Sequence, residues 1–396
     1  MIKPAVSLRD LGICCALGGS QSEVLERALV GDTSGMAINK DLLIGGGATV
    51  VGSVQEQLPS MDSYASNFQS RNNQVALHCL QQIQSSVERV KREYGTHRLA
   101  VVVGTSTSGI AEGEQALKQA VDGNLPTSYN YTTQEMGAVA DFIRFVSGVG
   151  GPAFSISTAC SSSAQALISA KELIASGVAD AVICGGVDSL CQLTVNGFHA
   201  LDSLSEDLCL PFSVNRNGIN IGEGGALFLL ERGTGGIQLL GTGSSSDAHH
   251  MSAPHPQGRG AIKAIHDACH EAQISPAELD YINLHGTATQ LNDAMESYAT
   301  TQVGAQRVAA SSTKPLTGHT LGAAGAIEVG LCWLLLSDWN PERNVIPHVW
   351  DEVPDPELRP LRFATGSDKI NKGYCLSNSF AFGGSNVSIV IGRAYP

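Results

Sequence analysis

Apolar and polar positions along the chain follow two alternating periods, which predicts strands and helices in alternation. The clearest case is 152–177, where 153–157 has the period of a strand and 164–174 has apolar residues at helical spacing. A continuous apolar run at 99–103 ends in a Gly/Ser turn, as a buried strand would. A strand followed by a small-residue turn is predicted within 6–19. Further strands are predicted at 179–186, 226–231, 237–241, 281–284, 308–311, 373–378 and 387–391, and helices at 22–29, 73–93, 111–121, 134–145, 260–272, 292–303 and 322–337.

This alternation predicts an α/β fold in which helices cover both faces of the sheets and parallel strand pairing dominates. Each half of the chain repeats the same plan of strand, helix and strand with a polar loop. A glycine cluster at 233–236 separates the halves, so we predict two similar α/β units, residues 1–236 and 237–396. Ligands of such sheets bind beyond the carboxyl ends of the strands, where Cys160 and His285 are both expected.

Composition and charge exclude several classes of protein. The net charge of −13 argues against a nucleic-acid binder, which needs clustered Lys and Arg. The ten cysteines are scattered without a C-x-x-C pair, so we expect neither a metal site nor a disulfide framework. No apolar run reaches the roughly 18 residues needed to cross a bilayer, and the first residues lack a signal-peptide layout. We therefore predict a cytoplasmic protein without a membrane span.

Cys160 lies at the junction of the predicted strand and helix. A thiol in the first turn of a helix lies beside unpaired backbone N–H groups and the positive end of the dipole, which lowers its pKa. The same N–H groups can hold an oxyanion. Taken alone, a buried structural cysteine is the commoner role. Taken singly, His285 and His319 are likewise more often surface or core residues.

Five motifs change this assessment when they are taken together. They are STACSSS at 157–163, NGINIGEGGA at 217–226, HGTAT at 285–289, STKPLTGHTLGAAGAIE at 312–328 and NSFAFGGSN at 378–386. In this order and spacing the chain resembles, over essentially its whole length, the elongating β-ketoacyl-acyl-carrier-protein synthases with a Cys-His-His triad. The resemblance implies the thiolase fold, with two similar α/β halves in a layered α-β-α-β-α architecture.

The family resemblance also implies a reaction, the decarboxylative Claisen condensation of a 3-oxoacyl-[acyl-carrier-protein] synthase. Cys160 would accept the growing acyl chain, while His285 and His319 would bind the malonyl thioester carbonyl and assist loss of carbon dioxide. A neutral imidazole suits this task, and a helix beginning near Gly322 would keep His319 neutral. Lys314 and Glu328 match the family's buried pair that orders the histidine loops.

Other residues receive roles only through the resemblance. The backbone N–H groups of Cys160 and Phe382 would form the oxyanion hole, and Phe382 would also gate the acyl pocket. The remaining substrate-binding residues are expected to hold the pantetheine arm or to shape the pocket, and they are Thr107, Thr287, Thr289, Phe380, Gly383 and Gly384. Asp247 would lie in a mobile loop at the mouth of the pocket.

Two departures from the fatty-acid members of the family bear on the substrate. HGTAT replaces HGTGT or HGTST, and Thr107 stands where a bulky apolar side chain often limits the acyl pocket. A small residue there suits a longer, unsaturated or aryl-bearing chain, as in ketosynthases of aryl polyene pathways, although plain fatty-acid elongation stays open. The basic cluster that docks the carrier is reduced to Arg71, which is either a docking residue or an ordinary surface arginine.

The resemblance implies partners but no cofactor beyond the phosphopantetheine of an acyl carrier protein. We expect a homodimer, or a heterodimer with a homologous chain-length factor, formed through the strand near Phe154, with the helix at 134–145 reaching the neighbour's pocket. One alternative is a non-catalytic subunit that resembles a chain-length factor, but the intact triad argues against it. Another thiolase-fold acyltransferase fits less well, because thiolases use a second cysteine and initiating synthases carry asparagine in place of His319.

Overall fold

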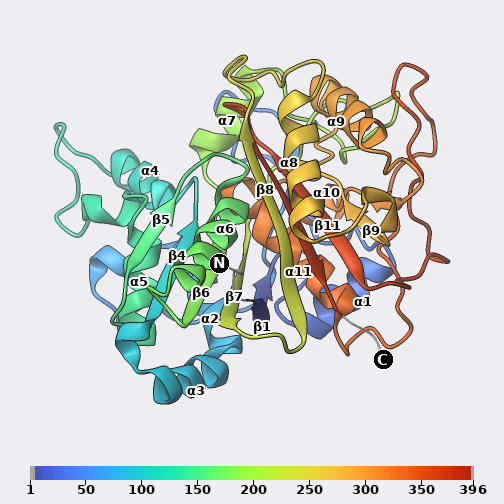
Figure 1. Cartoon of the computed structure of the whole chain (residues 1–396). Coiled ribbons are helices and arrows are strands. Elements are labelled where there is room, and N and C mark those ends of the chain that lie inside the picture. The colour runs from blue at the N-terminus through green and yellow to red at the C-terminus, as the bar shows by residue number, and fades with distance from the viewer. Residues whose placement is uncertain (1–4, 394–396) are drawn as a thin grey trace.

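The computed structural model describes residues 5–393, and its framework is a ten-stranded sheet made of two blocks of five strands (Figure 1). The spatial order is β10-β9-β11-β12-β8 in one block and β1-β7-β6-β4-β5 in the other. Within residues 5–393, the strand pairing that joins the blocks is that of Ser7 and Leu8 of β1 with Gln238 and Ile237 of β8. The strands are β1 (Val6–Cys14), β4 (Leu99–Gly104), β5 (Ala153–Ile156), β6 (Ala181–Asp188), β7 (Gly224–Arg232), β8 (Ile237–Ser246), β9 (Tyr281–Asn283), β10 (Ala309–Ser311), β11 (Tyr374–Phe380) and β12 (Ser385–Gly392).

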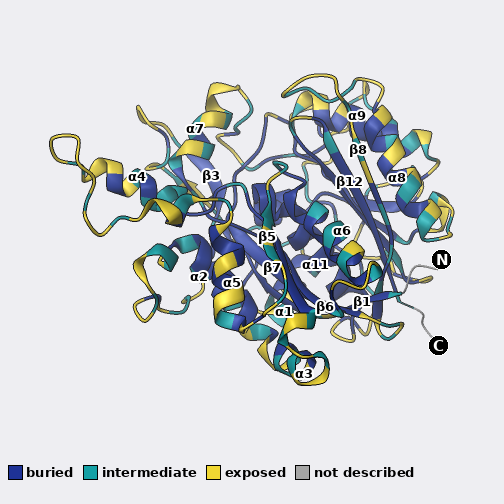
Figure 2. Cartoon of the chain, turned by 60° about the vertical axis from the view of Figure 1, so that its left-hand side comes forward, coloured by how far each residue is buried: buried dark blue, intermediate teal, exposed yellow. Residues whose placement is uncertain are grey.

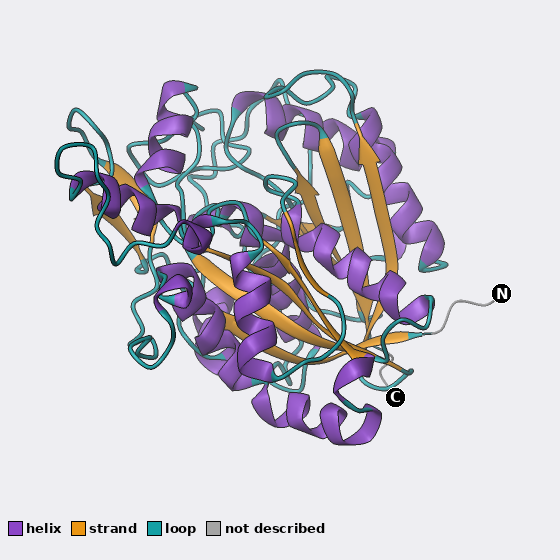
Figure 3. Ribbon diagram, turned by 90° about the vertical axis from the view of Figure 1, so that its left-hand side faces the viewer, coloured by secondary structure: helices purple, strands orange, loops and turns teal. Residues whose placement is uncertain are grey.

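Helices form three layers around the two blocks (Figure 3). The central layer contains α6 and α11, which contact each other and the strands on either side. The outer layers are α2 and α5 against the block that contains β1, β7 and β5, and α8 against the block that contains β8 and β12. The helices are α1 (Gln21–Leu29), α2 (Arg71–Gln82), α3 (Gln84–Tyr94), α4 (Ile110–Lys118), α5 (Ala138–Ser147), α6 (Ser162–Ala175), α7 (Gln192–Ala200), α8 (Arg259–Glu271), α9 (Gln290–Gln302), α10 (Lys314–Thr317) and α11 (Ala324–Leu336). This is the predicted α-β-α-β-α architecture.

Helix α11 explains why the central layer is tightly packed. Every residue of Ala324–Leu336 is buried, and apart from Glu328 the helix carries no charged or polar side chain on any side (Figure 2). A Cβ at Gly325 would lie 2.8 Å from the Cβ of Ala164 in α6, so glycine is needed where the two helices approach. The close contact fixes the start of α6 and the segment before α11, which are the two parts of the chain that carry Cys160 and His319.

Several predicted elements need correction. Parallel pairing does not dominate, because β12, β8, β1 and β7 are joined through antiparallel pairs, and only the ends of the two blocks are parallel. The helix predicted at 73–93 is two helices that meet at Ile83. Helix α7 and the small hairpin of β2 (Met36–Asn39) and β3 (Thr49–Gly52) were not predicted. Among the described residues, no helix is both long and apolar enough to cross a membrane.

Candidate active site

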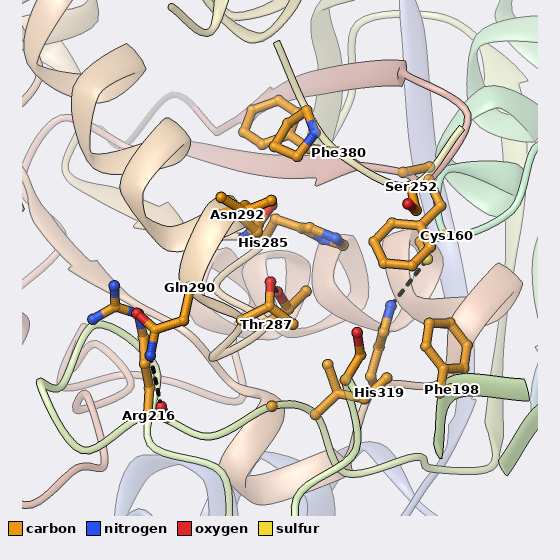
Figure 4. A pocket seen from close by; sticks show the side chains of 18 of the residues that line it. Cys160, Phe198, Arg216, Ser252, His285, Thr287, Gln290, Asn292, His319 and Phe380 are labelled. Carbon is orange, nitrogen blue, oxygen red and sulfur yellow. Dashed lines mark hydrogen bonds between the residues drawn. The ribbon is translucent and has the colours of Figure 1, made fainter. Parts of the chain in front are cut away.

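Cys160 lies in the turn between β5 and α6. Ala159 has a φ of +52°, a conformation that is strained for a residue with a Cβ, and it turns the chain so that Cys160 comes before the helix. The helix begins at Ser162 rather than at Cys160, with Ser161 as the N-cap. The Cys160 side chain is buried, and its Sγ lies 3.0 Å from Nε2 of His319 (Figure 4).

His319 is held by the segment that precedes β7. Its N–H donates to the carbonyl of Asn220 at 2.6 Å, and its carbonyl accepts from the N–H of Gly222 at 2.9 Å. Gly318 has a φ of +69°, and a Cβ there would lie 2.8 Å from Cα of Gly222. The NGINIGEGGA motif therefore packs directly against the His319 loop, which gives this motif a positioning role.

Glu296 on α9 holds the His285 loop. Its two carboxylate oxygens accept the N–H groups of His285 at 2.8 Å and Gly286 at 2.7 Å. The rings of His285 and His319 lie 5.4 Å apart at an interplanar angle of 83°. Sequence reasoning missed Glu296, although a carboxylate eleven residues after a histidine, on a predicted helix, was the available signal.

Lys314 and Glu328 form the buried pair that the sequence predicted. Nζ of Lys314 lies 2.6 Å from Oε1 of Glu328, and the two side chains are 1% and 3% exposed. Burial is the main cause that lowers the pKa of His285 and of His319 well below its usual value, and the charge of Lys314 lowers both pKa values further. Both imidazoles are therefore neutral near pH 7, with burial as the main cause and the charge of Lys314 as a further one.

The thiol of Cys160 behaves differently from the sequence prediction. Burial raises its pKa to about 11, while the charge of Lys314 and a hydrogen bond from the backbone of Phe382 act in the opposite direction. The prediction of a lowered pKa was therefore wrong in direction. A protonated thiol beside a neutral imidazole requires proton transfer to His319 when the sulfur attacks.

The reactive atoms of Cys160, His285 and His319 all lie within 4.8 Å of one another. Such a set is chemically suited to activate a thiol and to donate hydrogen bonds to one carbonyl. A thiol with two imidazoles also has the atom types and spacing of a metal site.

A pocket of about 230 Å³ opens onto these three residues (Figure 4). The predicted substrate-binding residues Thr287, Thr289, Phe380 and Phe382 all line it. The hydroxyls of Thr287 and Thr289 lie 2.9 Å apart. The ring of Phe382 lies 5.6 Å from that of Phe198 on α7, a pocket-lining residue that sequence reasoning missed because α7 itself was not predicted.

Three predicted pocket residues do not line the pocket. Thr107 is fully buried, and its hydroxyl donates to Oδ1 of Asp188 at 2.8 Å, so it does not present a small polar side chain to the substrate there. Gly383 and Gly384, with φ of +86° and +78°, form the turn after Phe382 instead. A Cβ at Gly384 would lie 2.9 Å from Cβ of Asp247, so glycine is needed for packing against that residue.

Asp247 and Arg71 are both held by contacts that the sequence did not reveal. Asp247 lines the pocket mouth but is anchored, because its carboxylate accepts from Nδ2 of Asn386 at 2.9 Å and from the N–H of His255 at 3.0 Å. Nη2 of Arg71 lies 2.7 Å from Oε1 of buried Glu223. Arg71 is thus the partner of an internal carboxylate, while its side chain stays 35% exposed, so its role in carrier docking stays a prediction.

The fold and the site together define a class, the thiolase-type acyltransferases that carry a thiol and two imidazoles. The model of the Beta-ketoacyl synthase N-terminal domain matches residues 45–234, and that of the C-terminal domain matches residues 237–345. The chain belongs to the β-ketoacyl synthase family. The predicted family, fold and enzyme class are confirmed at this level.

The chain is similar in sequence and structure to several individual members of this family. The 3-oxoacyl-[acyl-carrier-protein] synthase 2 of Rhizobium meliloti (strain 1021) is 36% identical over 61% of this chain and 61% of its own length. That of Staphylococcus aureus (strain COL) is 32% identical over 74% of each chain. Among solved structures, the ketosynthase ApeO from Xenorhabdus doucetiae, in complex with its chain length factor ApeC, is 44% identical with a TM-score of 0.94, covering 99% of this chain and 98% of that one.

Proposed function

We propose that this chain is the catalytic subunit of a ketosynthase and that Cys160, His285 and His319 carry out a decarboxylative condensation. The observation that supports this most strongly is the 3.0 Å contact between Sγ of Cys160 and Nε2 of His319 in a buried pocket that also contains His285. The 3-oxoacyl-acyl-carrier-protein synthases among its relatives support the same chemistry.

In the first step, the thiol of Cys160 passes its proton to Nε2 of His319 while the sulfur attacks the thioester carbonyl of an acyl carrier. The backbone N–H groups of Cys160 and Phe382 stabilise the oxyanion. The tetrahedral intermediate collapses, the pantetheine sulfur leaves, and His319 returns the proton to it. The product is an acyl-Cys160 thioester with His319 neutral again.

In the second step, His319 has moved its ring proton from Nδ1 to Nε2 by exchange with water, and His285 and His319 donate hydrogen bonds to the thioester carbonyl of a malonyl carrier. The bond from the α-carbon to the carboxylate breaks, carbon dioxide leaves, and its electron pair forms an enolate whose charge the two imidazoles stabilise. The enolate carbon attacks the acyl-Cys160 carbonyl and forms the new carbon–carbon bond. The Cys160 sulfur leaves as a thiolate and takes up a proton from water, and the 3-oxoacyl chain stays on the carrier.

The remaining site residues support these steps in the proposal. The Lys314–Glu328 pair orders the histidine loops, and Thr287 and Thr289 bind the pantetheine arm. Phe380 shapes the pocket beside His285, from which its ring lies 6.2 Å. The substrates arrive on the phosphopantetheine of an acyl carrier protein in the cytoplasm, and the chain uses no cofactor or metal of its own. The proposed domain limits are 1–236 and 237–396.

We also propose the aryl polyene branch and a heterodimer with a homologous chain-length factor. The greater identity to the ketosynthase ApeO, 44% against 36% and 32% for the two fatty-acid-type relatives, supports this choice. That ketosynthase was solved with a chain length factor. Thr107 no longer supports the branch, because it faces Asp188 instead of the pocket.

Intact-protein mass spectrometry after mixing with acyl-carrier thioesters tests the proposed function. We expect an acyl adduct on Cys160, absent in Cys160→Ala and retained in Cys209→Ala, which removes another buried cysteine. EDTA should leave the adduct unchanged. A preference for aryl or polyene acyl carriers over plain saturated ones would support the branch. Absence of any adduct, with or without a chain-length factor, would instead indicate a non-catalytic subunit.

A further inference from the structure

Asp188 is a fully buried carboxylate at the end of β6, and the site as described so far gives it no role. Strands β5, β4 and β6 are parallel neighbours, so their carboxyl ends meet at one edge of the block. The turn that carries Cys160 follows β5, the turn at 105–108 follows β4, and Asp188 ends β6. The strand order therefore places Asp188 near the turn that carries Cys160.

The carboxylate of Asp188 accepts six hydrogen bonds from two segments of the chain. Oδ1 accepts from the hydroxyls of Thr105 and Thr107 and from the N–H groups of Ser106 and Thr107, at 2.7–2.9 Å. Oδ2 accepts from the hydroxyl of Ser106 at 2.8 Å and from the N–H of Gly322 at 2.6 Å. Burial raises the pKa of Asp188, and these six hydrogen bonds act in the opposite direction because each partner donates to the ionised carboxylate.

Gly322 connects Asp188 to the catalytic histidine. It lies three residues after His319, and Leu321 between them has a φ of +49°, which is a strained conformation for leucine. A Cβ at Gly322 would lie 2.7 Å from Oδ2 of Asp188, so the backbone there is held tightly against the carboxylate. Asn220 and Gly222 hold His319 on one side of the strained residue, and Asp188 holds the chain on the other.

We propose that Asp188 is a positioning residue that keeps Nε2 of His319 in contact with Cys160. The inference rests on the proposed function, since it assigns His319 as the group that receives the Cys160 proton. Asp188 contacts neither of these side chains directly. It acts through the N–H of Gly322 and fixes the loop against the 105–108 turn.

A positioning role and a purely electrostatic role of Asp188 predict opposite changes in the reactivity of Cys160 when the carboxylate is removed. The negative charge of Asp188 is one of the influences that raise the pKa of Cys160, so removing the charge alone would make the thiol more reactive. Loss of positioning has the opposite effect, because a displaced His319 no longer accepts the proton. Asp188→Asn is nearly isosteric but turns an NH₂ group toward donors, which breaks at least one of the six bonds.

The experiment measures the rate of Cys160 alkylation by iodoacetamide between pH 6 and pH 9.5, which requires no carrier protein and so is independent of the proposed activity. For Asp188→Asn we expect a rate reduced roughly tenfold at pH 7. The difference in alkylation rate between Asp188→Asn and the wild type should become smaller at higher pH, because the thiol then ionises without help from His319. An unchanged or faster rate at pH 7 would overturn the proposal.

The matched control is Asp280→Asn. Asp280 also accepts hydrogen bonds from several backbone N–H groups, those of Asn371, Lys372, Gly373 and Tyr374. It lies before β9, at the end of that strand opposite to His285. Its alkylation profile should equal that of the wild type. If Asp188→Asn does not fold, Ser106→Ala removes one donor to Oδ2 and should slow alkylation at pH 7 by about twofold to threefold. An unchanged rate in Ser106→Ala would then refute the positioning role.

Discussion

The buried pair of Lys314 and Glu328 has two effects on the site. Its charges are taken out of water, which is costly unless both partners are present. The ammonium also disfavours a second positive charge on either histidine. A single pair therefore links the stability of the protein to the protonation state of its imidazoles, and substitutions at the two residues should reveal both effects.

Lys314→Met should reduce the free energy of unfolding by about 3–5 kcal/mol, because it leaves Glu328 charged and unpaired in the core. The double variant with Glu328→Leu should recover most of this loss. Urea unfolding followed by circular dichroism measures both. The control is Lys263→Met, because Lys263 pairs with Asp267 at 2.5 Å but is 63% exposed, and its loss should cost below about 1 kcal/mol. Equal losses at the two sites would contradict the argument.

The raised pKa of Glu296 makes the free energy of unfolding depend on pH. Burial raises its pKa to about 7 from an ordinary value of 4.5, although its hydrogen bonds with His285 and Gly286 oppose this. The folded state therefore binds a proton more tightly than the unfolded state. The stabilisation is complete below about pH 4.5 and is lost as the pH rises through about 7. Asp293, with a pKa raised to about 6, acts in the same direction.

Glu296→Gln should therefore flatten the decline in unfolding free energy between pH 4.5 and 7.5, because glutamine does not titrate. Urea midpoints at several pH values measure this slope. Glu357→Gln serves as a control on an exposed carboxylate. A slope that is unchanged in Glu296→Gln would show that other groups cause the dependence.

At the scale of elements, hydrophobic periodicity was sufficient to locate a strand or helix wherever its buried positions keep one regular spacing along the whole element. The strand at 99–104 and the helix at 259–271 lie within one residue of the prediction. Periodicity failed to give the right elements where tertiary contacts determine the helix boundaries. Ile83 belongs to the apolar stripe of 73–93 yet separates two helices, and α7 has only one buried residue, Val195, so its pattern is weak.

The site shows the same division between local signal and tertiary contact. The motifs located Cys160, His285, His319 and the Lys314–Glu328 pair, because each lies in a distinctive local sequence. The hydrogen bonds of Thr107 could not be read from sequence, since its acceptor Asp188 is 81 residues away. The raised pKa of Cys160 likewise depends on burial by segments distant in the chain.

The turn between β5 and α6 allows a prediction at this scale. Ala159 adopts a φ of +52°, which a β-branched residue tolerates poorly. Ala159→Val should lower the unfolding free energy by about 1–3 kcal/mol and slow alkylation of Cys160, because the turn that presents the thiol is strained further. Ala159→Gly should be close to neutral in stability. Thermal unfolding and iodoacetamide kinetics test this, and a neutral Ala159→Val would refute it.

For the whole molecule, the joined blocks leave β5 at one edge. Within residues 5–393, β5 pairs with β4 alone, so one side of Ala153–Ile156 has unpaired backbone groups. Phe154 on this strand is 39% exposed, and Phe145 on α5, which packs against β5, is 63% exposed. An open strand edge next to exposed aromatic rings is suited to pairing with a homologous chain.

Phe154→Arg should therefore prevent dimer formation, because it brings a charge into the proposed interface while costing the isolated subunit little. Light scattering after size-exclusion chromatography measures the mass of the chain alone and after co-expression with a chain-length-factor homologue. Trp339→Arg is the control, since Trp339 is also a half-exposed aromatic residue but follows α11, far from β5 in the chain. A dimer that persists in Phe154→Arg but dissociates in Trp339→Arg would move the interface away from this edge. A wild-type chain that dimerises only with the homologue would support the heterodimer, because the edge would then require a partner surface that a second copy does not supply.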